Sequence, residues 1–498
     1  MTLRLKTKNE NENEKLNIFQ KNFDFDILPK YGKKRDLIKD RYLVENNKYP
    51  HKYTIPSSYR KSFNNIPVYS IDPEGCKDAD DAFSIWVDSW GKLTLAIHIA
   101  DPTSYIDLES DLWKDIKDRV LTHYPSNTEP IHMMPDEILQ LSSLMENSKG
   151  TKKNAISIIT EISKDTYQPI GMVSIEFTTI NVSRENALTY QEASRQLEEN
   201  NRITEVLVCG LKISEALKKT RSSKTIGVKL NELENTRLIY RNDKVYFHID
   251  DESVIIMKQM IAEFAIFANS FVGNYLKHNL GNIGIFRTCD TNSWIKQVDS
   301  KVTGRELMNQ IIDNGISANY LSSVLSHDLV GMPEYCHFTS PIRRLSDCVC
   351  HYLVRYVYLT QKGYSGILTS PFLESELVEI ASRCHTITKK ERKIQYRDTK
   401  FRIIQAIANM FEIRQNPIPI KIRFTMYTGL FCNFIIEQIA EFDVFVSYSL
   451  RIRNYPTKYI NYWRSNSRKT LFITQIKSLG RFDEGTLPEL DQYIHNPL

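Results

Sequence analysis

The sequence lacks paired C-x-x-C spacing and any dense group of cysteines, although it contains eight cysteines among 498 residues. A disulfide-stapled secreted domain is therefore excluded, and reduced intracellular thiols are the simplest interpretation. Cys348, Cys350 and His351 are the group that most resembles a metal site. A zinc site would need a fourth ligand from elsewhere, and the residues around this group have the pattern of a packed helix, so we do not expect zinc there.

Long hydrophobic runs are also missing. The most apolar stretch, 254–273, is interrupted by Lys258 and Glu263, so we expect a buried helix rather than a membrane span. Residues 1–15 contain no apolar segment and several Asn and Glu residues, which argues against a signal peptide or an organellar transit peptide. The sequence therefore predicts an intracellular, cytoplasmic protein that does not enter a membrane.

An excess of one charge is absent as well, because 65 Lys and Arg face 60 Asp and Glu, for a formal net charge of +5. This balance says nothing about partners, although a local basic track can still bind phosphates. Hydrophobic residues make up 41% of the chain and charged residues 25%. That is ordinary globular usage, and it excludes a collagenous or fully disordered protein.

Three segments follow from the pattern along the chain. Residues 1–45 are polar and repetitive, and we expect a flexible arm without chemistry. In the main body the pattern of apolar residues predicts strands and long helices, and after Pro417 and Pro419 it predicts strands again. The expected strands are 83–86, 93–99, 156–162, 172–180, 237–240, 245–249, 420–424, 434–436, 442–449 and 471–476, and the expected helices are 190–219, 253–276, 342–359 and 373–413. The fold class is therefore α+β, with a mixed body at 46–414 and a small β-rich domain at 415–498.

A loop at 71–82 carries four aspartates in a turn-rich stretch that precedes a strand: Asp72, Asp78, Asp80 and Asp81. Carboxylates this close repel one another unless a cation is present. Oxygen ligands without nearby His or Cys select a hard cation such as Mg²⁺ or Mn²⁺. Pro73 and Gly75 allow the loop to fold back, so that the cluster can hold one or two metal ions and hydrolyse a phosphodiester. A solvated acidic turn remains the alternative, and a calcium loop is a weaker one because the bidentate Glu of such loops is missing.

A second motif starts with Ser340 and Pro341, which are good N-cap and first-turn residues of a helix. A helix that begins there would present free amides to an anion. Arg343 and Arg344 add guanidinium groups suited to phosphate, and Asp347 is spaced to orient Arg343. The alternative is a capped structural helix with an ion pair between residues four positions apart.

Both motifs resemble signatures of the RNB family, which comprises ribonuclease II, ribonuclease R and the exosome-type exoribonucleases. Residues 71–82 are similar to the family's aspartate loop, and 337–344 are similar to its H-F-T-S-P-I-R-R motif. Looser matches lie between them in the expected order. The resemblance covers roughly residues 50–410, and it implies an RNB catalytic domain at 46–414 followed by an OB-like domain at 415–498.

The resemblance implies a Mg²⁺-dependent enzyme, with Mn²⁺ as the alternative metal, that removes nucleotides from the 3′ end of single-stranded RNA and releases 5′-nucleoside monophosphates. The implied metal ligands are Asp72, Asp78, Asp80 and Asp81. Asp80 and Arg343 are the implied catalytic residues. The implied RNA contacts are Tyr124, Tyr190, Glu263, Arg343 and Arg344.

Other functions stay open from the sequence alone. A catalytically silent RNB-type protein could bind RNA or serve as a scaffold, and an endonuclease or DNA-active enzyme is a third hypothesis. Many relatives carry two cold-shock-type barrels before the aspartate loop; we expect this chain to lack them and a protein partner to replace them. The oligomeric state stays open.

Two groups of basic residues could line an RNA path. One is on the long helix at 373–413, where most of its members are expected to form a solvated face. The other, at 451–469, alternates with aromatic residues, and RNA binding there stays as open as a plain solvated surface.

Overall fold

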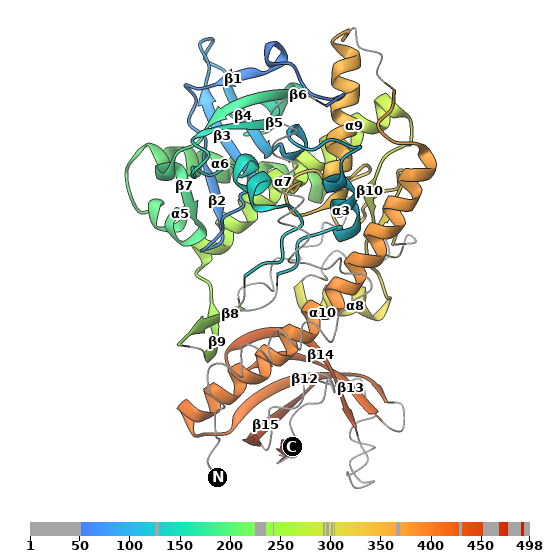
Figure 1. Cartoon of the computed structure of the whole chain (residues 1–498). Helices are drawn as coiled ribbons and strands as arrows, with labels where there is room; N and C mark the ends of the chain where they lie inside the picture. Colours follow the sequence, from blue (N-terminus) through green and yellow to red (C-terminus); the bar gives the residue numbers. More distant parts are fainter. Residues whose placement is uncertain are drawn as a thin grey trace.

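The structure is a computed structural model that describes residues 51–124, 129–224, 236–242, 244–291, 294, 298–299, 302, 304–364, 369–427, 431–451, 468–476 and 490–492. The expected polar arm at 1–45 lies outside these residues. Figure 1 shows a body of strands and helices, a separate sheet at the opposite end, and the long helix α10 that runs from one to the other.

The body is organised around a mixed five-stranded sheet with the order β1-β6-β5-β4-β3. Its strands are β1 (Lys61–Phe63), β3 (Asp81–Val87), β4 (Leu93–Ala100), β5 (Lys152–Ile162) and β6 (Pro169–Asn181). β1 lies parallel to β6, and the other neighbours are antiparallel. The strands expected at 83–86, 93–99, 156–162 and 172–180 are thus confirmed. Side chains on both faces of β4 are buried, because elements pack on both sides of the sheet.

Helices accompany the strands, as the α+β prediction required. They are α3 (Asp111–Arg119), α4 (Asp136–Ser142), α5 (Tyr190–Gln196), α6 (Arg202–Lys224), α7 (Glu252–Leu280), α8 (Gly304–Asp313), α9 (Leu345–Gln361) and α10 (Glu374–Arg414). The single helix expected at 190–219 is divided into α5 and α6. Thr189 begins α5 with a capping box that includes Glu192.

Helix α7 passes through the core of the body. Among the described helices it is the one that is long and apolar enough to cross a membrane by length and composition. In the structure it packs against other elements instead: Met257 and Met260 are fully buried, and the Phe264 ring lies 5.4 Å from the Phe83 ring of β3. The internal helix expected from the interrupted apolar run is confirmed.

Helix α9 contains the cysteine and histidine group. Cys348, Cys350 and His351 are all buried. Cys348 Sγ donates to Pro341 O at 3.0 Å, and His351 Nε2 lies 3.0 Å from Phe338 O. The packed-helix interpretation is therefore confirmed, and these side chains serve packing.

The small β-rich region expected after Pro417 is also confirmed. Its antiparallel sheet has the order β14-β13-β12-β15-β16, with β12 (Ile418–Tyr427), β13 (Phe431–Ile439), β14 (Phe442–Arg451), β15 (Arg468–Ile476) and β16 (Leu490–Gln492). A second hydrophobic core lies beneath it and includes Ile403 and Ile407 of α10. Helix α10 therefore contributes to both cores, and a domain division at 414/415 stays a prediction.

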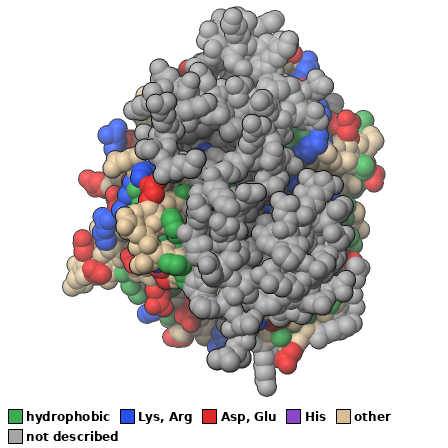
Figure 2. All heavy atoms as spheres, turned by 90° about the horizontal axis from the view of Figure 1, so that it is seen from below, with side chains coloured by type: hydrophobic (Ala, Val, Ile, Leu, Met, Phe, Trp, Pro, Cys, Tyr) green, Lys and Arg blue, Asp and Glu red, His purple; other side chains and the backbone are tan. Residues whose placement is uncertain are grey.

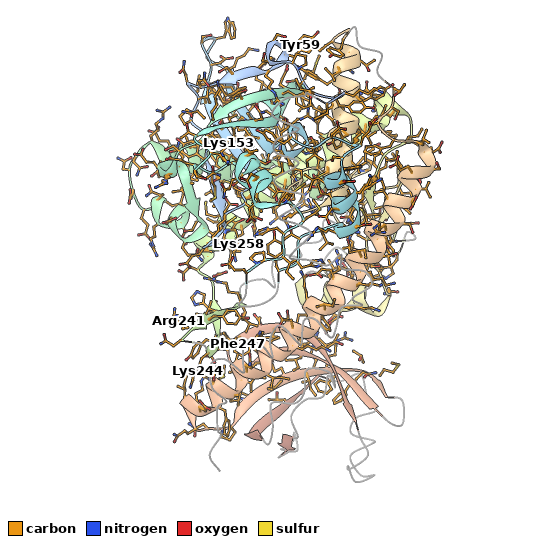
Figure 3. The ribbon with its side chains drawn as sticks, in the orientation of Figure 1. Tyr59, Lys153, Arg241, Lys244, Phe247 and Lys258 are labelled. Atoms are coloured by element: carbon orange, nitrogen blue, oxygen red, sulfur yellow. The ribbon has the colours of Figure 1, made fainter. Side chains whose placement is uncertain are left out.

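The hairpin of β8 (Thr236–Arg241) and β9 (Lys244–Ile249) connects the body with this sheet. Figure 3 shows Phe247 of β9 and its neighbour Lys244 above the C-terminal strands. The Phe247 ring stacks on Phe442 with centroids 5.1 Å apart, and Lys244 Nζ lies 3.1 Å from Glu412 Oε2 of α10. The expected strand pair is confirmed, and its packing ties the middle of the chain to the C-terminal sheet.

Opposite charges are interspersed around this end of the molecule. In Figure 2, Lys and Arg side chains alternate with Asp and Glu side chains around the rim of the face. Arg468 illustrates the balance, because its guanidinium pairs with both Glu437 and Glu306. Most of the basic and aromatic group expected at 451–469 lies at 452–467, outside the described residues.

A buried ion network ties α9 to the end of β4. The Asp101 carboxylate accepts from Arg355 Nη2 at 2.5 Å and from Arg60 Nη2 at 3.0 Å, and the Asp101 and Arg355 side chains are both 0% exposed. Burial disfavours the charged form of Asp101, but Arg355 and Arg60 outweigh burial and hold the pKa of Asp101 well below its usual range. Removing one partner would strand the other charge in the core.

We therefore predict that Asp101→Asn lowers the free energy of unfolding by about 3–5 kcal/mol, as measured by urea denaturation. The matched control is Asp118→Asn, because Asp118 pairs with Arg383 at the surface and exposed pairs contribute little. A loss in Asp101→Asn as small as that of the control would contradict the prediction.

A second prediction concerns acid stability. His98 of β4 is fully buried between Ser84 Oγ, at 3.0 Å, and Ser157 Oγ, at 2.7 Å. Burial lowers the pKa of His98 to about 3, whereas the unfolded side chain titrates near its ordinary value of about 6.5. The unfolded state therefore binds a proton first, so His98 makes folding less favourable as the pH falls from about 6.5 to about 3.

The expected result is that His98→Asn reduces the slope of unfolding free energy against pH by about one proton, or about 1.4 kcal/mol per pH unit. Urea unfolding at a series of pH values between 7 and 4.5 measures this slope. Identical slopes for both proteins would show that His98 does not stay neutral in the fold.

Candidate active site

The aspartate loop connects β2 (Ser70–Asp72) with β3. β2 pairs in parallel with β7 (Ala187–Thr189), and Asp72 lies opposite Thr189. Gly75 has a φ of +81°, so the expected backbone reversal at this glycine is confirmed. Backbone hydrogen bonds fix the end of the loop, since Leu144 N donates to Ala79 O at 3.0 Å and Ala100 N donates to Asp80 O at 2.8 Å.

Asp80 is the most buried of the four aspartates, with 5% of its surface exposed. Its Oδ1 accepts from Ile342 N at 2.8 Å, and its Oδ2 accepts from Arg343 Nε at 3.1 Å. Burial raises the pKa of Asp80, while Arg343 and the Ile342 amide act in the opposite direction. Both oxygens of Asp80 are therefore already bound by the arginine loop, which we define as residues 337–344.

Asp72 and Asp81 are in a different electrostatic situation. Burial, followed by the Asp81 and Asp78 carboxylates, raises the pKa of Asp72 to about 7. Burial also raises the pKa of Asp81 to about 6, although Arg343 and Arg344 oppose this effect. Asp72 Oδ2 is buried and has no hydrogen-bond partner among the residues that the structure describes. A cation placed among these oxygens would relieve both the repulsion and the unpaired acceptor.

The oxygen-rich donor set suits a hard divalent cation. Across the described ranges, no three acidic, His or Cys side chains converge closely enough in this structure to coordinate one ion. The residues best suited to bind such a cation are Asp72, Asp78 and Asp81. Both oxygens of Asp80 already accept hydrogen bonds from the arginine loop. The assignment of all four aspartates as metal ligands stays a prediction.

Sequence reasoning missed two neighbours of Asp78. Cys76 Sγ lies 3.6 Å from Asp78 Oδ1 and 3.8 Å from Asp72 Oδ1, and burial raises the pKa of the Cys76 thiol. His132 Nδ1 lies 3.7 Å from Asp78 Oδ2. The spacing of Cys76 within the loop was a visible signal, whereas His132 is brought in only by the tertiary fold.

The expected helix start at Pro341 is wrong. Residues 341–343 form a turn, and α9 begins at Leu345. The amide of Ile342 does meet an anion, as expected of the free amides in this motif, but that anion is the carboxylate of Asp80. A continuous helix from Pro341 would not form this turn. The local capping signal was overridden by a long-range contact.

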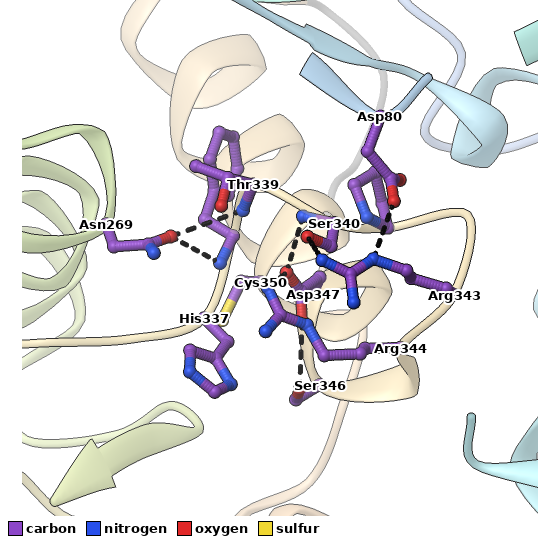
Figure 4. A network of polar contacts seen from close by, with 12 residues as sticks. Asp80, Asn269, His337, Thr339, Ser340, Arg343, Arg344, Ser346, Asp347 and Cys350 are labelled. Carbon is purple, nitrogen blue, oxygen red and sulfur yellow. Dashed lines mark hydrogen bonds and ion pairs between the residues drawn. The ribbon is translucent and has the colours of Figure 1, made fainter. Parts of the chain in front are cut away.

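The expected role of Asp347 is also wrong. Asp347 Oδ1 accepts from Arg344 Nη2 at 2.8 Å and from Ser340 N at 2.8 Å, so it orients Arg344 rather than Arg343. Arg343 is held by Asp80 and by Ser340 Oγ, which lies 3.0 Å from Arg343 Nη2. Figure 4 shows Arg343 directed to Asp80, while the guanidinium of Arg344 lies toward His337.

Asn269 of α7 holds the other end of the arginine loop. Its Oδ1 accepts from Phe338 N at 2.8 Å and from Thr339 N at 3.2 Å, as Figure 4 shows. Gly273, one turn later, permits this close approach, because a Cβ there would lie 3.1 Å from Tyr335 N. The core helix therefore sets the position of the loop that carries Arg343.

The expected RNA contacts are distributed unevenly. Tyr124 is 38% exposed, and its hydroxyl donates to Asp78 Oδ2 at 3.4 Å. Tyr190 opens α5 directly after Thr189, so the β2–β7 pairing brings it to the loop, and burial followed by the Asp81 and Asp72 charges raises its pKa. Tyr124 and Tyr190 are thus brought together with the aspartates.

Glu263 of α7 differs from these tyrosines. It is 4% exposed, and both of its carboxylate oxygens pair with the Arg221 guanidinium of α6. Arg221 Nη1 also donates to Val330 O at 3.0 Å. In this structure Glu263 is therefore engaged in a helix-to-helix ion pair, and its predicted RNA contact stays a prediction.

Comparison with known proteins finds a matching domain model and similar ribonucleases. The RNB domain model matches residues 60–359. Ribonuclease R of Helicobacter pylori (strain ATCC 700392 / 26695) is 26% identical over 377 residues, which cover 68% of this chain and 54% of that protein. The chain thus spans about half the length of this curated relative.

Two solved structures share the fold at low sequence identity. Mycoplasma genitalium RNase R in complex with ribose methylated single-stranded RNA superposes with a TM-score of 0.68 at 17% identity, covering 90% of this chain and 74% of that one. Yeast Ssd1, described as a pseudonuclease, superposes with a TM-score of 0.62 at 17% identity, covering 80% of this chain and 51% of that one. The same architecture therefore occurs with and without nuclease activity.

The crowded carboxylates generate a prediction about metal binding. Saturating Mg²⁺ or Mn²⁺ should stabilise the wild-type protein by about 2.7 kcal/mol when the metal is 100-fold above its Kd. Asp81→Asn should abolish this gain, and without metal it should be at least as stable as the wild type, because one repelling charge is removed.

Chemical denaturation with and without the metal measures both effects. Asp165→Asn, which removes an exposed carboxylate outside the loop, is the matched control and should respond to metal as the wild type does. Equal stabilisation of Asp81→Asn and the control would rule out Asp81 as a ligand.

Proposed function

This chain belongs to the RNB domain family, and from that premise we propose that it is a Mg²⁺-dependent 3′→5′ exoribonuclease. The proposed substrate is single-stranded RNA, the proposed products are 5′-nucleoside monophosphates, and Mn²⁺ is the alternative metal. The presence of all four aspartates supports this proposal.

One observation carries the proposal: the aspartate loop and the arginine loop meet through Asp80. Ile342 N and Arg343 Nε donate to its two carboxylate oxygens across 262 and 263 residues of chain. A carboxylate cluster that binds cations thus lies beside a guanidinium suited to a phosphate. This is the pair of charges that hydrolysis of a phosphodiester requires.

The residues have separate proposed roles. Asp72, Asp78 and Asp81 hold the metal, which when bound supplies a Lewis acid and a water of lowered pKa. Asp80 fixes Arg343 through Nε. Arg343 is 44% exposed, and its Nη1 has no hydrogen-bond partner among the described residues. That nitrogen remains available to a phosphate oxygen and to the negative charge that develops on it.

The tyrosines fit the same proposal. Tyr124 and Tyr190 lie beside the aspartates, and aromatic faces stack on bases without regard to sequence. Each tyrosine also carries a hydroxyl, and that of Tyr124 reaches Asp78. We therefore assign to these side chains the terminal nucleotides of the RNA, and to Arg344 the support of the arginine loop.

A catalytically silent RNA-binding protein is the second candidate. The observation that favours it is the fold shared with the yeast pseudonuclease. The observation against it is the retained set of four aspartates together with the contact between Asp80 and Arg343. The two candidates agree on RNA binding and differ in turnover.

We predict metal-dependent shortening of a 5′-labelled single-stranded RNA by one nucleotide at a time. A copy with a blocked 3′ end, a DNA copy and a circular RNA should remain intact. Gel electrophoresis of time points measures the products. Binding of the RNA without shortening, in both Mg²⁺ and Mn²⁺, would select the silent protein, and cleavage of the circular RNA would select an endonuclease.

Asp80→Asn should lower turnover by at least about 100-fold, because the carboxylate that positions Arg343 loses its charge, while the affinity for RNA stays within about threefold of wild type. Single-turnover kinetics and fluorescence anisotropy measure the two quantities. Asp165→Asn again serves as the control. Turnover near the wild-type rate in Asp80→Asn would refute this role.

A further inference from the structure

A small, partly open pocket lies beside the arginine loop, and none of the four aspartates lines it. Its volume is about 150 Å³, well below the roughly 300–1,000 Å³ typical of pockets for drug-sized ligands. Its walls come from β10 (Phe286–Thr288), β11 (Asn319–Leu321), the arginine loop and α10. Apolar atoms form much of the wall surface, and six polar side chains contribute to it: Arg287, Tyr320, His337, Arg344, Thr388 and Arg392. A pocket of this size and composition suits a small anionic group.

Arg287 is the central observation. Only 3% of its surface is exposed. Its guanidinium lies 4.6 Å from the centre of the Tyr320 ring, and it has neither a carboxylate partner nor a hydrogen-bond acceptor among the described residues. Arginine stays protonated in proteins, and a buried charge without a counter-ion is costly. A bound anion would therefore stabilise the charge of Arg287.

The Asp347 carboxylate, which pairs with the pocket residue Arg344, already has its own partners. Asp347 Oδ1 accepts from Arg344 Nη2 and Ser340 N, and Asp347 Oδ2 accepts from Ser346 Oγ at 2.9 Å. The Arg344–Asp347 pair is thus neutral as a unit. Even so, Arg344 Nε is buried and has no hydrogen-bond partner in the described ranges. A second donor in the pocket is unsatisfied, independently of Arg287.

Two positive charges remain after this pairing. Arg287 is buried, and Arg392 stands exposed on α10 at the edge of the pocket, with no partner in the part of the chain that the structure describes. His337 adds no charge, because burial and then the Arg344 and Arg287 guanidinium groups lower its pKa. The pocket therefore has a net charge of +2 that an anion would balance. The hydroxyl of Thr388 adds a hydrogen-bonding group to its wall.

We propose that this pocket binds a phosphate group, held by Arg287, Arg392 and the Nε of Arg344. A free phosphate dianion balances both charges, and a phosphodiester of an RNA strand balances one of them. Either group accepts several hydrogen bonds, and guanidinium groups match its geometry. The group comes either from free phosphate, including a mononucleotide, or from the backbone of an RNA strand. Binding of an RNA backbone phosphate rests on the proposed function, whereas binding of free phosphate does not.

The first experiment measures binding of inorganic phosphate without divalent metal. Thermal unfolding is followed in sodium phosphate and in sodium chloride of equal ionic strength. Phosphate should raise the Tm of the wild type by about 2–4 °C more than chloride. Arg287→Met and Arg392→Met should lose this shift, and Lys390→Met, which removes a charge from an exposed position of the same helix outside the pocket, should keep it.

The stability of Arg287→Met in chloride separates a lost site from a lost fold. Replacing an unpaired buried charge by an apolar side chain of similar length should leave its Tm equal to or above that of the wild type. Arg392→Met provides a second variant on an exposed position, where folding is not at risk. The loss of the phosphate effect in both variants therefore reports on the pocket.

The second experiment tests the RNA source in the Asp80→Asn background, so that the RNA stays intact. Fluorescence anisotropy should show that Arg287→Met and Arg392→Met weaken binding at least about fivefold and lower the salt dependence by about one phosphate contact, unlike Lys390→Met. Loss of the phosphate shift with unchanged RNA affinity would support the pocket with free phosphate as its ligand. The absence of both effects would overturn the proposal, whether or not the protein hydrolyses RNA.

Discussion

The contact between Asp80 and the arginine loop is the constraint on which the rest of the site depends. It joins segments 263 residues apart, and it uses both oxygens of one carboxylate. The loop is held at its other end by Asn269 of the core helix α7, and it is stiffened by Asp347. A change in any of these contacts would move Arg343 relative to the aspartates. The geometry of the site therefore depends on all of them together.

Buried charge is handled in three ways in this molecule. Asp101 is fully paired with Arg355 and Arg60, and it supports the fold. The aspartates of the loop are crowded without sufficient positive charge, which raises the pKa of Asp72 to about 7 mainly through burial and then through Asp81. Arg287 is buried, and no described residue supplies a counter-charge to it. Only the first case is self-sufficient; the other two leave an imbalance that a ligand of opposite sign would correct.

Most of the fold was predictable from local pattern. The strands β3 to β6 and β12 to β15, the hairpin β8–β9 and the long helices follow from periodicity of apolar residues, since each of these elements has a buried face long enough to be recognised. The three-residue strands, such as β2 and β7, could not be found in this way. They are defined by pairing across the chain, and they matter because they place Tyr190 beside Asp72.

The sequence by itself determined the four clustered aspartates, the need of such a cluster for a cation, and the phosphate-like chemistry of the two arginines. Only the tertiary structure decided which partner each group takes. Asp347 orients Arg344 instead of Arg343, the free amide of Ile342 is taken by Asp80, and Glu263 pairs with Arg221. Charge and residue type are local properties, whereas a hydrogen-bond partner is selected by distance in the folded chain.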